Sequence, residues 1–251
     1  METDFVYKRF LPDEINAVDN QGQTLLHRAI EREQEAVVQL LSNLPKSQIV
    51  WRVPYPGHKG NPRVDLDATI KDNCKRTPLY LSVATGNTRI VELVTKMTYN
   101  VDAPGPFNRT PLHLAVIKSM SEIVKFLVSQ GASPLSRDKE GSTPIGVAAK
   151  IGSVIIVDIL FKSSPAEELI ASTSGTDSSS LLHLAAESDN IDTVVYLLSR
   201  LVDTRSRDLN GYTAAHIASR HGNVRTLRQL ISTDRWLRDA INIDGFTLVH
   251  E

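Results

Sequence analysis

Cysteine is almost missing from this chain of 251 residues, in which Cys74 is the single copy. One cysteine cannot form an internal disulfide, so a reducing compartment is favoured. No apolar run approaches the ~20 residues that a helix needs to cross a bilayer. The first ten residues, with the acidic Glu2 and Asp4, do not form a secretory signal peptide. We therefore expect a cytoplasmic, intracellular protein that is attached to a membrane only through regions outside this chain.

An excess of charge of one sign is also absent, because 28 Lys and Arg residues face 29 Asp and Glu residues, for a net charge of −1. This balance provides no overall field that would attract nucleic acid or a membrane surface. The contents of 41% hydrophobic and 23% charged residues are typical of an ordinary soluble protein. A single compact core of 251 residues would be near the usual upper size, and a stack of repeats avoids this limit.

What the chain does contain is one four-residue motif, Thr-Pro-Leu-His in its fullest form, that returns at a regular spacing. The copies are residues 24–27, 77–80, 110–113, 143–146, 180–183, 213–216 and 247–250. Their starts differ by 53, 33, 33, 37, 33 and 34 residues, which is a period of 33 with insertions of 20, 4 and 1. A period near 33 that contains a helix start is a signature of stacked helical repeats.

The third copy shows how each tetrad begins a helix. Thr110 is an N-cap residue whose hydroxyl accepts a bond from the backbone, and Pro111 suits the first helical position. A second helix follows and ends before Gly131. Its apolar pair stands thirteen and fourteen residues after every tetrad start: Val37-Val38, Ile90-Val91, Ile123-Val124, Ile156-Val157, Thr193-Val194 and Thr226-Leu227. This unbroken register predicts an all-α fold in which the second helices bury these pairs.

A turn precedes each tetrad. Residues 19–23, 138–142 and 208–212 begin with Asp and contain a Gly that supplies positive φ. Asn108 takes the Gly position in the third copy and tolerates that conformation, whereas Lys75 in the second copy leaves the turn geometry open.

The turn, the Thr-Pro-Leu-His helix and the Ile-Val-x-x-Leu helix together resemble the ankyrin repeat family. The resemblance implies an ankyrin-type solenoid of stacked helix-turn-helix repeats with hairpin-like turns and a concave binding face.

The resemblance divides the chain into an N-terminal segment, residues 1–15, and a repeat domain, residues 16–251, with about six full repeats and a partial seventh. An insertion at about residues 45–66 is either a surface excursion, with Trp51 packed on the first repeat, or a loop that contacts a partner. The polar residues 171–180 form a flexible spacer or a phosphate acceptor. Since the helix begun by residues 247–250 has no second helix to bury it, we expect the native chain to continue past Glu251.

The seven histidines do not indicate a metal site or a catalytic site. Five of them share one tetrad position, so they lie about one repeat apart, too far for one ion with ~2 Å bonds: His27, His113, His183, His216 and His250. In the family this histidine is a structural hydrogen-bonding residue. No phosphate-binding glycine loop, nucleophile elbow or cysteine–histidine signature is present. We therefore expect no cofactor, no metal and no catalytic residue.

Arginine is concentrated near the end of the chain. Residues 200–240 carry eight Arg, no Lys and four Asp. Arg suits planar, bidentate contacts with carboxylate or phosphate. The concentration indicates either ordinary solvated helix surface or an acidic partner near the C-terminal repeats. Nucleic acid is disfavoured because aromatic residues for base stacking are not interleaved with these arginines.

The function predicted from these observations is a non-enzymatic scaffold or adaptor module that binds a protein partner on its concave face. The alternative is a cytosolic ankyrin segment of a larger membrane protein or bacterial effector. Turn tips and the exposed ends of first helices are the family's variable positions, and we expect them to bind the partner. Here they are Phe107, Arg109, Lys118, Leu209, Tyr212, Arg220 and His221. Phe107 and Tyr212 could instead pack against neighbouring turns.

Overall fold

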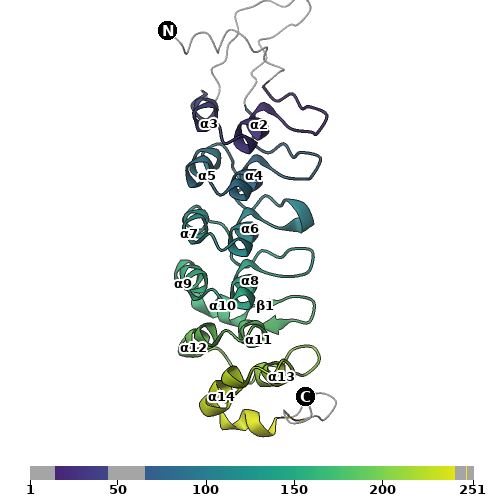
Figure 1. The fold of residues 1–251 in the computed structure, drawn as a ribbon, viewed down its shortest axis with the longest axis vertical. Helices are drawn as coiled ribbons and strands as arrows, with labels where there is room; N and C mark the ends of the chain where they lie inside the picture. The colour runs from purple at the N-terminus through teal and green to yellow at the C-terminus, as the bar shows by residue number, and fades with distance from the viewer. Residues whose placement is uncertain (1–14, 45–65, 241–246, 248–251) are drawn as a thin grey trace, which may run out of the picture. The chain divides into compact units, whose positions relative to one another are not determined.

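The computed structural model describes residues 15–44, 66–240 and 247, which fall into two compact units, residues 1–106 and 107–251 (Figure 1). Three predicted features lie outside the described residues: the N-terminal segment up to residue 14, the insertion from residue 45 to 65, and the seventh tetrad other than Thr247.

The first unit contains two helix pairs. They are α2 (Leu25–Glu31) with α3 (Glu35–Ser42), and α4 (Pro78–Thr85) with α5 (Thr88–Thr95). The first helices α2 and α4 pack against each other, and so do the second helices α3 and α5. Ile30 and Ile90 are fully buried between them, so the two repeats of this unit cover apolar faces of each other's helices.

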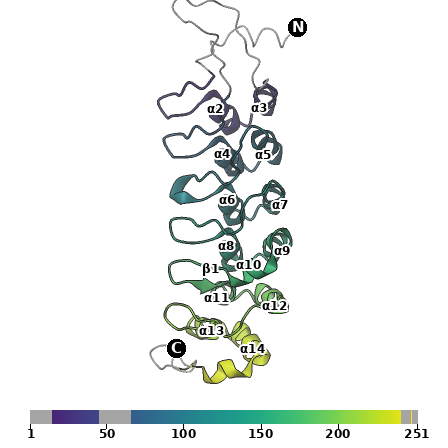
Figure 2. The ribbon, with the colours of Figure 1, turned by 180° about the vertical axis from the view of Figure 1, so that it is seen from behind.

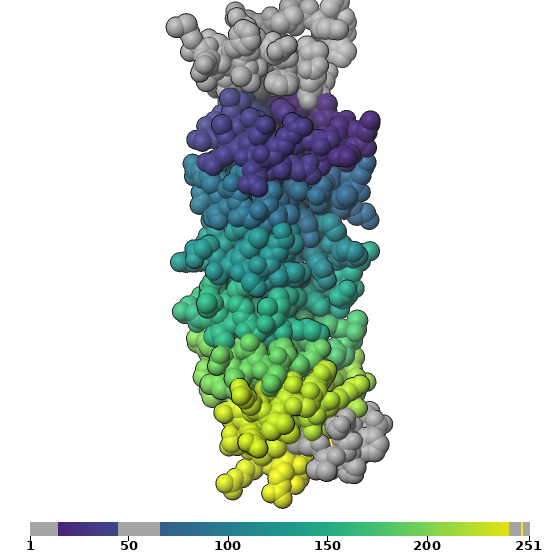
Figure 3. Space-filling view, in the orientation of Figure 1, coloured from purple at the N-terminus to yellow at the C-terminus, as the bar shows by residue number. Residues whose placement is uncertain are grey.

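The second unit contains four helix pairs. They are α6 (Pro111–Ile117) with α7 (Ser121–Ser129), α8 (Pro144–Ile151) with α9 (Val154–Ser163), α11 (Leu181–Glu187) with α12 (Ile191–Ser199), and α13 (Ala214–Arg220) with α14 (Val224–Thr233). Additional short elements are η1 (Pro106–Asn108), α10 (Ala166–Ala171), β1 (Thr173–Ser174), β2 (Ser179–Ser180) and η2 (Arg235–Asp239). The first helices form one row and the second helices another, seen from both sides in Figures 1 and 2. In the space-filling view, side chains of consecutive repeats of this unit abut one another (Figure 3).

The predicted helix register is confirmed. Val38, the Ile90-Val91, Ile123-Val124 and Ile156-Val157 pairs, Thr193, Val194 and Thr226 are buried; Val37 and Leu227 are half-buried. Three residues further along each helix, a buried aliphatic side chain packs into the same layer: Leu41, Val94, Leu127, Leu160, Leu197 and Leu230. Burial of these side chains contributes to the hydrophobic stabilisation of the stack.

The tetrads cap the first helices, and in three of them the histidine also joins its repeat to the next one. In the third repeat the Thr110 backbone N–H donates to the Nδ1 atom of His113 at 3.1 Å, and the Thr110 Oγ1 accepts from the His113 backbone. The Nε2 atom of His113 reaches the Ser142 carbonyl of the following repeat at 3.0 Å. An imidazole that accepts at Nδ1 must donate at Nε2, so it is neutral. The prediction of a structural role for this histidine is confirmed.

His27 and His183 make the same bridge. Their Nε2 atoms lie 3.2 Å from the Arg76 carbonyl and 2.8 Å from the Tyr212 carbonyl. Burial is the main cause that lowers the pKa of His27, His113 and His183, because a charged imidazole would lose its hydration. In each case the carbonyl belongs to the residue just before the next tetrad. For His216 that residue is number 246, which lies outside the described residues.

The turns before the tetrads, called fingers from here on, are connected by backbone hydrogen bonds. Within the second unit Lys139 donates to the Phe107 carbonyl at 2.9 Å, and Leu209 donates to the Asp177 carbonyl at 3.0 Å. The expected positive φ is present at Asn108, and Lys75 also adopts it, with φ of 64°. Lys75 therefore takes the left-handed conformation that Gly22, Gly141 and Gly211 have in their fingers.

The two tetrads that lack histidine are matched by changes in the finger that follows. Tyr80 replaces histidine in α4, and its ring lies so close to Gly105 that a Cβ there would stand 2.6 Å from a ring carbon. Gly105 therefore makes room for the larger side chain.

Residues 171–180 differ from the flexible loop that the sequence predicted. The strands β1 and β2 pair antiparallel, with Thr173 opposite Ser180 and Ser174 opposite Ser179. Ser174 is only 2% exposed. A run of serines and threonines has no apolar period from which a strand could be predicted. The paired strands in the structure show that this finger has a regular conformation.

Candidate functional site

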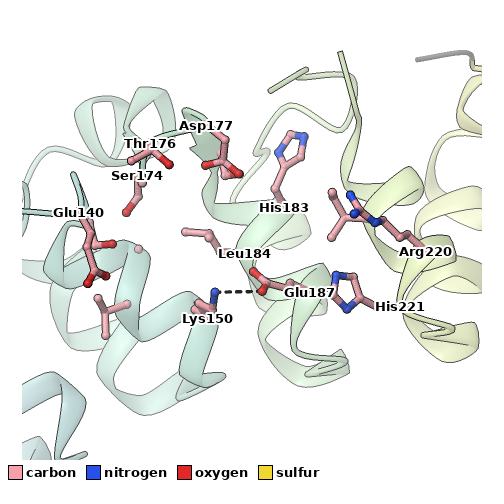
Figure 4. Close-up of a pocket in the computed structure, with 16 residues that line it drawn as sticks. Glu140, Lys150, Ser174, Thr176, Asp177, His183, Leu184, Glu187, Arg220 and His221 are labelled. Atoms are coloured by element: carbon pink, nitrogen blue, oxygen red, sulfur yellow. Dashed lines mark ion pairs between the residues drawn. The ribbon is translucent and has the colours of Figure 1, made fainter. Parts of the chain in front are cut away.

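A groove crosses three successive repeats of the second unit. It has a volume of about 530 Å³ and is lined by residues of α8, α11 and α13 and of the fingers before α8 and α11 (Figure 4). The helices form its floor and one edge, and the fingers form the other edge. It therefore has the length and openness to hold an extended segment of another chain.

The floor of the groove is apolar. Val147, Leu184 and Ile217 each stand four residues after the N-cap of their helix, and all three line the groove. They are half-buried, whereas the alanines of the opposite helix face, such as Ala148 and Ala185, are fully buried between helices. The repeat period thus builds a ladder of aliphatic side chains that water still reaches.

The edge formed by the helix ends carries charge. Lys150, Glu187 and Arg220 occupy the seventh position after each N-cap and line the groove. The Lys150 Nζ atom lies 2.9 Å from the Glu187 Oε1 atom, so these two charges pair across neighbouring repeats (Figure 4). The Arg220 guanidinium lies 6.0 Å from the centre of the Tyr212 ring and forms no ion pair within the described part of the chain. His221 adjoins it and is exposed.

The finger edge is acidic. Glu140 and Asp177 line the groove and are exposed. The Glu140 Oε2 atom lies 3.9 Å from the Arg109 Nη2 atom, a long contact at an exposed side chain. Among the described residues, the Asp177 carboxylate has no hydrogen bond and no ion pair. The groove therefore has an acidic end at Glu140, beside α8, and a basic end at Arg220 on α13, with Asp177 on the finger of the middle repeat.

Gly146, in the histidine position of α8, shapes the end of the groove. Ser174 from the next finger occupies the space that an imidazole fills elsewhere, and its hydroxyl accepts the Thr143 N–H at 3.0 Å. A Cβ on Gly146 would lie 2.5 Å from the Ser174 Cβ and closer still to its hydroxyl. The serine thus replaces the missing histidine as the acceptor for the N-cap backbone.

This exchange predicts coupling between the two positions. Gly146→Ala should destabilise the unit by about 1–3 kcal/mol through overpacking, and Ser174→Gly by a similar amount, about 1–3 kcal/mol, because the Thr143 N–H loses its acceptor. The double variant Gly146→His, Ser174→Gly restores the acceptor and should lose less than the sum of the losses of Gly146→His and Ser174→Gly. Chemical denaturation of the three variants measures this coupling; strict additivity would contradict it.

The structure places the sequence-predicted site residues in three locations. Arg220 and His221 line the groove. Tyr212 contacts Arg220, but its half-buried ring packs edge-on against His216 of its own repeat, with ring centres 5.9 Å apart. Leu209 is 67% exposed at a finger tip.

The remaining three predicted residues lie at the first repeat of the second unit and do not line the groove. Phe107 is 62% exposed, and the Arg109 guanidinium lies 5.7 Å from the centre of its ring. The Arg109 Nε atom also contacts the Asp138 carboxylate of the next finger at 3.2 Å. Lys118 is exposed at the end of α6. Arg109 therefore already has a partner in the fold.

Sequence reasoning missed the floor and the paired charges of the groove. The signal for the floor was present, because the residue four positions after the tetrad start is aliphatic in five consecutive copies: Leu81, Leu114, Val147, Leu184 and Ile217. The pairing of Lys150 with Glu187 had no such signal, since it joins residues in different repeats.

Part of the arginine excess near the C-terminus is neutralised within the fold. Two guanidinium nitrogens of Arg205 contact the Asp234 carboxylate at 2.6 and 3.1 Å. These bonds hold the pKa of Asp234 at about 2. The Arg205 guanidinium also lies 5.1 Å from the centre of the Trp236 ring. The cluster fixes η2 to the preceding finger, so Arg205 is a structural residue.

The described part of the chain offers little for other kinds of site. Within residues 15–44, 66–240 and 247, no group of three or more His, Cys, Asp or Glu side chains is arranged to hold a metal ion. In the same residues, no helix has the length and hydropathy to cross a membrane.

Comparison with known proteins gives the family context. The family model described as "Ankyrin repeats (3 copies)" matches residues 59–138, 122–208 and 182–251, more than half of the chain. The crystal structure of the ankyrin repeat domain of Bcl-3 superposes with a TM-score of 0.75, covers 92% of this chain and 94% of that chain, and is 22% identical in sequence. The prediction of an all-α ankyrin-type fold is confirmed.

Several longer proteins are similar to this chain. Rabankyrin-5 of Mus musculus is 29% identical over 214 residues, which are 83% of this chain and 17% of that protein. B-cell lymphoma 3 protein of Homo sapiens is 32% identical over 146 residues, 57% of this chain and 32% of that protein. Transient receptor potential cation channel subfamily A member 1 of Homo sapiens is 26% identical over 95% of this chain and 20% of its own length. This chain thus spans a third or less of each relative.

Proposed function

Because the chain belongs to the ankyrin repeat family, we propose that it is a non-enzymatic scaffold or adaptor module that binds a protein partner in the groove of its second unit. Ankyrin repeats are in general protein–protein interaction modules. The module works in the cytoplasm, in keeping with its single cysteine.

The observation that carries this proposal is the groove itself. Its volume of about 530 Å³ is lined by three half-buried aliphatic side chains in a row and by charged side chains on both edges. Covering aliphatic side chains that are exposed to water lowers the free energy of the complex and so favours binding. Arg is among the residues that dominate binding energy at interfaces. Arg220 and His221 are the centre of the proposed binding surface.

The other predicted contacts extend this surface. Leu209 and Phe107 are exposed at finger tips, and Arg109 and Lys118 follow Phe107 in the chain. We assign Tyr212 the role of holding the Arg220 guanidinium, on which its ring stacks. An acidic group on the partner is the natural complement of Arg220, which has no ion pair among the described residues.

A second candidate is that the chain is the ankyrin segment of a larger membrane protein or effector. The relatives favour it, since the chain corresponds to 17% of Rabankyrin-5 and 20% of the cation channel. In that case the groove positions another part of the same polypeptide or its target. Transmembrane helices or an enzyme domain in the native reading frame would identify this arrangement.

The proposed groove is tested by binding. Affinity capture from native lysate with mass spectrometry supplies a partner, and the Arg220→Ala, His221→Ala double variant should then bind it at least tenfold more weakly. Both side chains are exposed, so the melting temperature should stay nearly unchanged.

Arg228→Ala provides the matched control. Arg228 is an exposed arginine of the same repeat, but it lies on the second helix α14 and does not line the groove. Its replacement should leave the affinity within twofold. Equal losses from both variants, or a loss from Arg228→Ala alone, would place the binding surface elsewhere.

A further inference from the structure

We propose that the groove selects an extended segment with a basic residue at one end, an acidic residue six positions away, and apolar residues at the second and fourth positions between them. This inference rests on the proposed function and names the chemistry of the partner segment.

The polarity of the groove fixes the charges of the occupant. Glu140 stands on the finger before α8, at one end of the groove, whereas Arg220 and His221 stand at the end of α13, at the other end (Figure 4). Asp177 stands on the finger of the middle repeat. Lys150 and Glu187, between them, neutralise each other at 2.9 Å. A partner therefore meets one acidic end and one basic end, with the Asp177 carboxylate on the finger edge between the two.

The length of the groove fixes the spacing. Neighbouring helices pack with axes ~8–10 Å apart, so two steps from α8 to α13 cover ~16–20 Å. An extended chain advances about 3.3–3.6 Å per residue, so five or six residues span that distance. Side chains of an extended chain alternate between its two faces. Residues six apart thus point the same way, with two further residues on the same face between them.

The floor fixes what those two residues are. Val147, Leu184 and Ile217 form the floor and are half-buried. Apolar side chains at the two middle positions would cover this ladder, and a polar side chain there would lose hydration without a hydrogen-bonding partner on the floor. The finger wall offers Ser179 and the backbone around Gly175 to the alternate face of the segment.

The direct test uses a fluorescein-labelled peptide with the core Lys-Ser-Leu-Ser-Leu-Ser-Glu and fluorescence anisotropy. The chain should bind it at least tenfold more tightly than a scrambled peptide of the same composition, Leu-Lys-Glu-Ser-Ser-Ser-Leu. Arg220→Glu should weaken binding of the first peptide at least tenfold. The same variant should regain affinity for a peptide in which the terminal Glu is replaced by Lys. Arg228→Glu, with the same change of charge on α14, should leave binding unchanged.

Two results would overturn the inference: equal affinity for the ordered and scrambled peptides, or a loss with Arg220→Glu that the Lys-ended peptide does not recover. The proposed function is judged separately, by the protein partner and the Arg220→Ala, His221→Ala variant. If that variant loses the protein partner but the peptides show no preference, the groove binds protein and the segment pattern is wrong. If the variant keeps the partner, the proposed function itself fails.

Discussion

Replacing Leu160 by alanine should lower the free energy of unfolding by about 2–5 kcal/mol, as for other fully buried leucines. Leu160 lies in α9, is 0% exposed, and belongs to a helix that packs on both α7 and α8. The cavity left by the missing side chain would lie between repeats, so the contacts on both sides of α9 would weaken. Leu127 in α7 has the same burial, and its alanine variant should lose a similar amount. Urea denaturation followed by circular dichroism measures both losses.

Ile155→Ala is the matched control for this prediction. Ile155 is on the same helix and is also a large aliphatic residue, but it is 68% exposed. Its replacement should change the stability by no more than about 0.5 kcal/mol. Losses below 0.5 kcal/mol at both Leu127 and Leu160 would show that the inner face of the second helices is assigned incorrectly.

Acidification from pH 6.5 to pH 5 should produce the second large loss of stability. Burial lowers the pKa of His27, His113 and His183 in the folded state. The pKa of histidine in the unfolded chain is about 6.5. Below that pH, the histidines of the unfolded chain bind protons that the buried histidines of the folded chain do not bind. Stability is therefore complete above that pH and falls as the pH decreases toward the lowered folded pKa. The slope approaches about 1.4 kcal/mol per pH unit for each histidine.

The pH window separates the histidines from the carboxylates. The pKa of Asp19 is lowered chiefly by the Gln23 backbone hydrogen bond, and that of Asp158 by Lys162, both from 3.8. These groups reduce stability only at pH values near and below 3.8. Denaturation at several pH values between 8 and 5 should show a smaller slope for His113→Gln than for the unchanged chain. His221→Gln, at an exposed position, should keep the full slope; equal slopes for all three would refute the histidine assignment.

The repeating part of the fold could be predicted from sequence because each prediction rested on local physics. Thr110 and Pro111 begin a helix by their own capping and backbone preferences, and the structure starts α6 there. The buried pair Ile123-Val124 followed from its place on an amphipathic helix.

The parts that escaped prediction depend on contacts between different repeats. Ser174 accepts a hydrogen bond from a residue 31 positions earlier, and nothing in a serine-rich stretch specifies that partner. Tyr212 was predicted either to bind the partner or to pack against a neighbouring turn, and its half-buried ring contacts His216 and Arg220 of its own repeat. The groove was predicted only at Arg220 and His221, because its volume arises from the relative placement of three repeats.

At two junctions between repeats, the size of a tetrad residue matches the space that the next finger leaves for it. This match restricts how the repeats could be rearranged in the gene. Gly105 accommodates the Tyr80 ring, and Ser174 fills the space over Gly146. A chimera that deleted the segment between two such partners, or exchanged two repeats, would set a tyrosine against a finger without room for it, or leave a void beside a glycine. The order of the repeats is therefore restricted by side-chain size at these two junctions. Duplication or loss of a repeat here requires compensating substitutions in the neighbouring finger.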